Sequence, residues 1–140
     1  MIGVRSIACK AGETQILRVL DRVIADTKAQ HVNALVLVGD ACEEDKRPLR
    51  YAANELGLCH TPVFCLQEGN DKDATKAFQQ IAQFSGGAYL PFDLSSIDKL
   101  RDLLAAITVF ALGGKDALRE LAGSNTEAKR LTEQLRLPAA

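Results

Sequence analysis

Residues 34–38, Ala-Leu-Val-Leu-Val, are apolar at every position, and this run stops abruptly at Gly39-Asp40. A strand with one buried face alternates apolar and polar residues, whereas a strand that is apolar throughout is covered from both sides. Such strands are typical of parallel sheets with helices packed against them. The run therefore predicts a strand inside the parallel sheet of an α/β fold.

Three other strand-like runs occur along the chain, and stretches with helical periodicity separate them. Strands are predicted at residues 4–9, 34–38, 63–66 and 88–93, and helices after Gly12, near Pro48, from an N-cap at Asp73 and around Ile97. Pro91 cannot donate a hydrogen bond to a neighbouring strand, so the fourth strand is expected at an edge. The alternation indicates a Rossmann-like α/β fold, a mostly parallel sheet of about four strands with flanking helices.

The C-terminal part of the chain is predicted to be helical. The helix that includes Ile97 should end at Gly113-Gly114, and a short helix should follow it. Ser124 and Glu127 have the spacing of a capping box, which predicts the start of a last, polar helix. We therefore expect an α/β domain over residues 1–122 and a C-terminal helix and tail over 123–140.

Composition limits the classes of partner. The chain has 140 residues, with 17 Lys+Arg against 18 Asp+Glu, so no basic excess favours nucleic acid or an anionic membrane. We expect neither as a partner. Cys9, Cys42, Cys59 and Cys65 lack the spacing of a zinc site. The cysteines are expected to be reduced thiols in a cytoplasmic protein.

Acidic and hydroxyl side chains follow the predicted strands. Ligands of open α/β sheets bind at the carboxyl ends of the strands, and oxygen ligands suit magnesium. The residues at these positions are 12–14, 39–44, 68–71 and 93. Among them, Thr14 could simply cap a helix and Asp40 could simply form a turn. The acidic residues 43–45 are expected to favour the positive end of the helix that follows them.

A catalytic site is the weaker alternative. His31 and His60 precede strands, so they should lie at the opposite end of the sheet from Thr14 and Asp40. Cys42 follows the strand at 34–38 near a helix start, a position that can lower a thiol pKa. A hydrolase that uses Cys42 or a metal-activated water therefore stays open as an alternative function.

The segment Ala34-Leu-Val-Leu-Val-Gly-Asp40, together with Gly12-Glu-Thr14 and Gly86-Gly-Ala-Tyr89, resembles the von Willebrand factor A (VWA) domain. The resemblance covers about residues 4 to 118. It is narrowest to a bacterial branch of that superfamily, through the motifs GDACEE, FCLQEGND, IAQFSGGAY and FALGGKDAL. The resemblance implies a non-catalytic protein-interaction module.

VWA domains share a metal-ion-dependent adhesion site, built from Asp-x-Ser-x-Ser after the first strand, a Thr in a second loop and an Asp in a third. Thr14 and Asp40 match the second and third elements, but the first element is missing. Residues 93–97, Asp-Leu-Ser-Ser-Ile, follow the last strand and carry Ile97 in place of the final serine. The resemblance therefore implies a vestigial site, with magnesium held weakly by Thr14 and Asp40.

The resemblance also predicts an unusual sheet, because the chain should begin at the family's third strand. The strand at 34–40 would then lose its central neighbour and expose an open edge, which proteins avoid. The strand at 4–9 is expected to pair there instead, so that all crossovers step in one direction and place their helices on one face. The other face would be covered by residues 96–137 or by a second copy. We therefore expect a homodimer or a substantially rearranged half-domain. A structural or assembly role as a homodimer is a further alternative function.

Overall fold

The computed structural model describes residues 3–8, 16–93 and 95–135, with the backbone alone for 3–8. The chain divides into a first unit, Met1–Pro91, and a second unit, Phe92–Ala140. Each unit is described by itself below.

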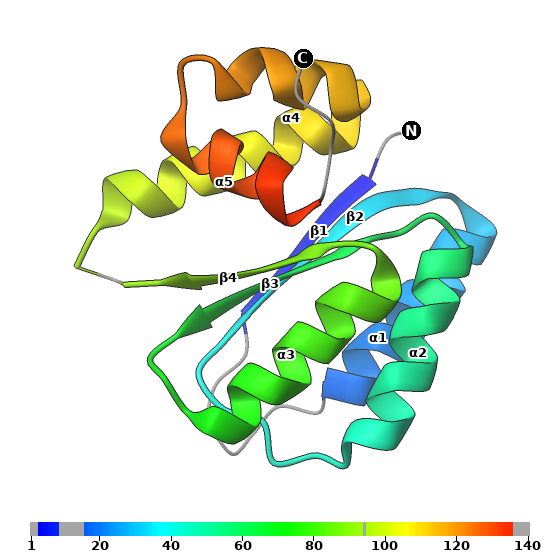
Figure 1. Ribbon diagram of the computed structural model, residues 1–140. Coiled ribbons are helices and arrows are strands. Elements are labelled where there is room, and N and C mark those ends of the chain that lie inside the picture. The colour runs from blue at the N-terminus through cyan, green and yellow to red at the C-terminus, as the bar shows by residue number, and fades with distance from the viewer. Residues whose placement is uncertain (1–2, 9–15, 94, 136–140) are drawn as a thin grey trace. The chain divides into compact units, whose positions relative to one another are not determined.

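Strands and helices alternate along the first unit (Figure 1). The elements are β1 (Gly3–Ala8), α1 (Ile16–Ala29), β2 (Val32–Gly39), α2 (Lys46–Leu58), β3 (Val63–Glu68), α3 (Lys72–Ser85) and β4 (Ala88–Phe92). This order confirms the predicted α/β fold with its Rossmann-like alternation.

The strand order in the sheet is β1-β2-β3-β4. β1 pairs with β2 and β2 pairs with β3, both in parallel, and Leu37 lies opposite Ile7 on one side and Cys65 on the other. Each crossover therefore moves one position in the same direction, as predicted for a strand at 4–9 that pairs with the apolar strand. β4, which contains Pro91, lies at an edge, and this too was predicted.

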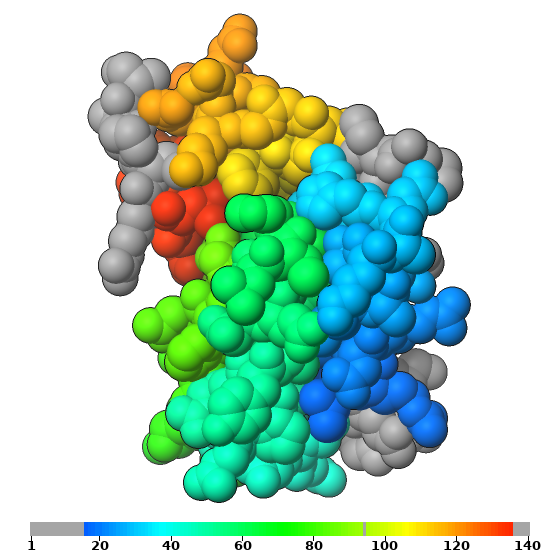
Figure 2. Space-filling view, turned by 90° about the vertical axis from the view of Figure 1, so that its right-hand side faces the viewer, coloured from blue at the N-terminus to red at the C-terminus, as the bar shows by residue number. Residues whose placement is uncertain are grey.

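One face of the sheet packs against α1, α2 and α3, which lie on the same side in Figure 1. The core there joins Leu35 and Cys65 of the strands to Leu20, Leu56 and Phe78 of the three helices. Figure 2 shows α1 (blue) and α2 (turquoise) side by side, in agreement with their contacts. Right-handed crossovers that step in one direction account for this one-sided layer of helices.

The strand residues between these core positions point to the opposite face, and they are buried as well. Ala34, Val36, Phe64 and Leu66 are at most 2% exposed. β2 and β3 are therefore buried on both faces, which the uninterrupted apolar run predicted.

Two aspartates cap helices in the first unit. Asp45 accepts a hydrogen bond from Arg47 N at 3.1 Å and starts α2. Asp71 accepts from Ala74 N at 2.9 Å and starts α3. The prediction that Asp73 is the N-cap was wrong, since Asp73 lies in the first turn of α3. Its negative charge in that turn is favourable beside the positive end of the helix dipole.

The second unit contains α4 (Ile97–Ala122) and α5 (Thr126–Gln134), which pack against each other. A kink at Gly114, with φ 78° and ψ −164°, separates two helical segments within α4, as Gly113-Gly114 predicted. The predicted boundary between 122 and 123 coincides with the end of α4, inside this unit. None of the helices among the described residues is both long and apolar enough to cross a bilayer.

The start of α5 differs from the sequence prediction. Asn125 is the N-cap, and its side-chain oxygen accepts from Ala128 N at 3.0 Å. The predicted capping box of Ser124 and Glu127 was therefore wrong. Glu127 forms an ion pair with Arg130 at 2.9 Å instead. Asn and Ser cap helices about equally well, so side-chain type alone did not decide between neighbouring positions.

Candidate functional site

The carboxyl ends of β2 and β3 carry most of the acidic residues that the sequence singled out. β2 is buried at six of its eight residues and ends at Gly39, so Asp40 directly follows a well-packed strand. Asp40 is exposed, and among the described residues it forms no hydrogen bond or ion pair. Its predicted partner Thr14 lies outside the described residues. The structure thus places Asp40 as predicted and leaves its pairing with Thr14 a prediction.

Glu44 has a role that the sequence did not indicate. Its two carboxylate oxygens accept hydrogen bonds from the backbone amides of Ile16 and Leu17, the latter at 3.1 Å. Glu44 therefore caps α1, whereas we predicted that it favours the start of α2. The first amides of a helix have no partner within that helix, and a carboxylate also matches the positive end of its dipole. The loop after β2 is thus tied to the helix after β1.

Cys42 lies in the same loop, and its environment disfavours a nucleophilic role. The residue is 9% exposed. Burial raises the pKa of the Cys42 thiol, and it outweighs the backbone hydrogen bond from Glu44 and the charge of Lys46, which lower that pKa. An activated cysteine has the opposite property, a lowered pKa that supplies thiolate at neutral pH. The hydrolase alternative based on Cys42 stays a prediction, and this environment does not favour it.

We expect Cys42 to be alkylated slowly in the folded protein. Because the pKa of Cys42 is raised, a smaller fraction of it is thiolate at neutral pH, and burial also limits the access of the reagent. Iodoacetamide at about pH 7 should therefore modify Cys42 at least about tenfold more slowly in the folded protein than in denaturant. Cys59 is partly exposed and should be modified first. Mass spectrometry of the cysteine peptides at successive times measures both rates. Modification of native Cys42 as fast as a free thiol would contradict the buried position.

Gln67 forms a polar network that the sequence analysis missed. The residue is fully buried at the end of β3. Its Oε1 accepts hydrogen bonds from Tyr89 Oη at 2.6 Å and from Thr75 Oγ1 at 2.8 Å, and its Nε2 donates to the carbonyl of Asp71 at 3.1 Å. A single glutamine near the end of an apolar strand could have indicated this network, because a buried side-chain amide needs hydrogen-bond partners. Gln67 thereby joins β3, β4 and the start of α3.

The two histidines lie at the amino ends of the strands, as predicted. His31 precedes β2 and His60 precedes β3. His31 Nε2 lies 3.1 Å from the carbonyl oxygen of His60, and both residues are exposed. They are therefore at the opposite end of β2 from Asp40 and belong to a different part of the surface.

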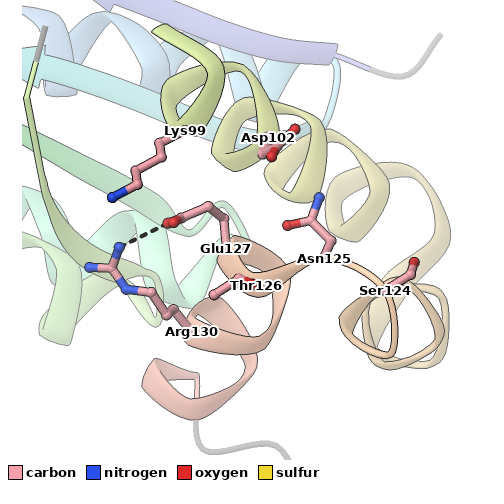
Figure 3. A pocket seen from close by; sticks show the side chains of 7 residues that line it. All are labelled: Lys99, Asp102, Ser124, Asn125, Thr126, Glu127 and Arg130. Carbon is pink, nitrogen blue, oxygen red and sulfur yellow. Dashed lines mark hydrogen bonds and ion pairs between the residues drawn. The ribbon is translucent and has the colours of Figure 1, made fainter. Parts of the chain in front are cut away.

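The second unit has an open polar pocket of about 550 Å³ (Figure 3). In that view, the side chains of Lys99, Glu127 and Arg130 point toward one another, and Glu127 accepts from Arg130 at 2.9 Å. The lining residues are Lys99, Asp102, Ser124, Asn125, Thr126, Glu127 and Arg130. Two cationic side chains face two carboxylates, so the charges of the pocket select neither an anion nor a cation.

Magnesium binding can be judged only from part of the predicted ligand set. Within the described ranges, no group of three or more His, Cys, Asp or Glu residues is arranged to hold a metal ion. Asp40 is the one predicted ligand that these ranges contain. Magnesium prefers six oxygens in octahedral geometry, so a single carboxylate does not fit tight binding.

Comparisons of the chain with protein-family models, with curated proteins and with solved structures find no match. The resemblance to the VWA domain therefore remains a prediction from the motifs that suggested it.

Proposed function

We propose that the chain is a non-catalytic protein-interaction module similar to the VWA domain, and that it binds its partner at an acidic rim. The acidic rim comprises Asp40 and Glu43, which follow β2, and Glu68, the last residue of β3. The proposal depends on one observation above all. The carboxylate of Asp40 is exposed at the end of a buried strand and has no partner among the described residues.

The other acids in these loops support a division of roles. Glu44, Asp45 and Asp71 each accept hydrogen bonds from backbone amides at helix starts. Those carboxylates stabilise helices, and the loss of each cap would lower the free energy of unfolding by about 1 kcal/mol. Asp40 accepts no such hydrogen bond from the residues that the structure describes, so a cation or a basic group can bind it without breaking a helix cap there. A rigid strand end also positions the carboxylate before the partner arrives, which reduces the entropy lost on binding.

The chemistry of Cys42 favours binding over catalysis. A thiol hydrolase needs a thiolate at neutral pH, and burial of Cys42 raises its pKa. Among the described residues, Cys42, Cys59 and Cys65 form no disulfide, which fits a reducing compartment, so a cytoplasmic location is part of the proposal.

Magnesium enters the proposal as a weak ligand. Thr14 and Asp40 would be its protein ligands, and water would fill the other positions. When bound, the cation would allow the carboxylate of a partner to approach Asp40, because it neutralises the repulsion between two acids. This chain's own contribution is to hold Asp40 at the end of β2.

We expect Asp40→Asn to weaken this binding further. In a titration with magnesium chloride, followed by amide chemical shifts at residues 39–41, the wild type should show millimolar affinity. Asp40→Asn should weaken the affinity at least about tenfold, because magnesium loses a charged oxygen ligand. Asp21→Asn is the matched control, since it removes the same charge from an exposed position on α1, outside the acidic rim.

Two results would contradict the proposal. Micromolar or tighter magnesium affinity would mean a complete site, and equal affinity in Asp40→Asn would exclude Asp40 as a ligand. Partner binding is tested by retention of protein from an extract of the native cells, with magnesium and with EDTA. The retained partner should be lost in Asp40→Asn and kept in Cys42→Ser. A thiol hydrolase would instead lose its activity in Cys42→Ser.

A further inference from the structure

Large apolar side chains are exposed on two neighbouring helices of the first unit. Tyr51 and Leu58 of α2 are 72% and 74% exposed, and Phe84 of α3 is 41% exposed. Tyr51 and Leu58 are separated by two helical turns, so they lie on the same side of α2. We call these three residues the α2–α3 surface. It lies away from the acidic rim, because Leu58 and Phe84 are at the C-terminal ends of their helices.

A glycine brings the two helices together at this surface. A Cβ atom at Gly57 would lie 2.8 Å from the carbonyl oxygen of Phe84, closer than packed atoms allow. The backbones of α2 and α3 are therefore in direct contact beside Leu58 and Phe84. Leu58 directly follows this contact on α2, Phe84 is part of it on α3, and Tyr51 lies two turns earlier on the same side of α2 as Leu58.

Exposed positive charges lie on the same two helices as the apolar side chains. Arg47 is one turn before Tyr51 on α2, Arg50 precedes Tyr51, and Lys76 lies on α3. All three are exposed, and in the part of the chain that the structure describes none of them forms an ion pair. Three unmatched cations beside an apolar area favour a partner with negative charge.

The acidic residues of the same two helices are already matched. Glu55 pairs with Lys28 of α1 at 2.7 Å, and Asp73 pairs with Lys46 at 4.0 Å. They therefore do not neutralise Arg47, Arg50 or Lys76. The balance of charge on α2 and α3 is positive, although the whole chain has a net charge of −1.

We propose that the α2–α3 surface binds an acidic amphipathic helix of a partner protein. Arg47 to Leu58 spans about 16 Å along α2, the length of roughly three helical turns. A helix of that length can place apolar side chains at i, i+3, i+4 and i+7 against Tyr51, Leu58 and Phe84. Its carboxylates would then face Arg47, Arg50 and Lys76, where opposite charges set the orientation and speed the association.

The test uses the full chain and two synthetic helical peptides of roughly four turns. One peptide carries leucines on one face and glutamates beside them, and the other has lysine in place of every glutamate. In fluorescence anisotropy, the glutamate peptide should bind with a dissociation constant in the range of tens of micromolar. The lysine peptide should bind at least about tenfold more weakly, because Arg47, Arg50 and Lys76 repel it.

Variants locate the binding. Leu58→Ser should lower the affinity for the glutamate peptide at least about tenfold, since apolar anchors dominate the energy of such contacts. Leu112→Ser is the matched control, because Leu112 is 55% exposed on α4 and lies outside the α2–α3 surface. Both changes are on the surface, so thermal unfolding should confirm that both variants stay folded. Arg50→Glu should weaken the binding of the glutamate peptide and strengthen the binding of the lysine peptide.

Three outcomes would overturn the proposal. The first is no binding of the glutamate peptide up to about 1 mM, an affinity near 4 kcal/mol. The second is equal binding by wild type and Leu58→Ser. The third is a homodimer in sedimentation equilibrium that Leu58→Ser dissociates, which would make a second copy the occupant of the α2–α3 surface.

Discussion

Replacing Gly87 with alanine is expected to lower the free energy of unfolding by about 3 kcal/mol or more. Gly87 connects α3 to β4 and passes directly beside the first residue of β3. A Cβ atom there would lie 2.0 Å from the carbonyl oxygen of Val63 and 2.9 Å from its nitrogen. These are backbone atoms, so no side chain can rotate away to make room. Either β3 or the start of β4 has to move, and the core on both faces of the sheet moves with it.

Two other glycines provide a graded comparison. Gly57→Ala should have a smaller effect, because its closest contact is 2.8 Å and involves the C-terminal end of α3. Gly123→Ala should be neutral or raise stability by about 0.5 kcal/mol, since its φ of −65° suits alanine and its nearest contact is 3.4 Å. Denaturant unfolding followed by amide exchange in β3 measures all three. An insoluble Gly87→Ala beside a soluble Gly123→Ala agrees with the prediction, whereas equal stability contradicts it.

The fold could be predicted from the sequence because its main determinants are local. The apolar run at 34–38 requires cover on both faces, and Pro91 requires an edge, so the parallel sheet and the position of β4 followed. The strand order followed from the open edge that the apolar strand would otherwise have. Helix caps were less certain. Asp71 and Asp73 have identical side chains, and only the backbone geometry at Asp71 makes it the cap.

The candidate site was less predictable, because its contacts join distant parts of the chain. Asp40 follows directly from the end of a strand, and its position was predicted correctly. Glu44 caps a helix that begins 28 residues earlier, and nothing in residues 40–45 indicates that contact. The burial of Cys42 likewise depends on the path of the loop after β2. The position of Cys42 after a strand and near a helix start suggested a reactive thiol, whereas in the fold this thiol is buried.

Thr61→Val is expected to destabilise the protein by about 2 kcal/mol, because it breaks a buried chain of hydrogen bonds. Val32 N donates to Thr27 Oγ1 at 3.0 Å, and Thr61 Oγ1 donates to the carbonyl of Val32 at 2.8 Å. The hydroxyls of Thr27 and Thr61 are 2.9 Å apart. Since the Thr61 proton is directed to Val32, the Thr27 proton is the one shared between the two hydroxyls. Each of these donors therefore has a defined acceptor.

Valine has nearly the same shape as threonine, so the substitution leaves packing in place and removes only the hydroxyl. Thr27 then has no acceptor and the carbonyl of Val32 loses a donor, both at buried positions. Thr108→Val is the control, because Thr108 is exposed on α4 and its bond to Leu104 O competes with water; it should change stability by less than about 0.5 kcal/mol.

Thr27→Val combined with Thr61→Val tests whether the two hydroxyls act together. The first valine already leaves its partner unsatisfied, so the second removes a group that no longer contributes. The double variant should therefore be more stable than the sum of the single effects predicts, by about 1 kcal/mol. Additive effects, or a Thr61→Val as mild as Thr108→Val, would mean that water satisfies these groups. A coupled result would identify the hydroxyl pair as the contact that fixes the amino end of β2, and so the strand that positions Asp40.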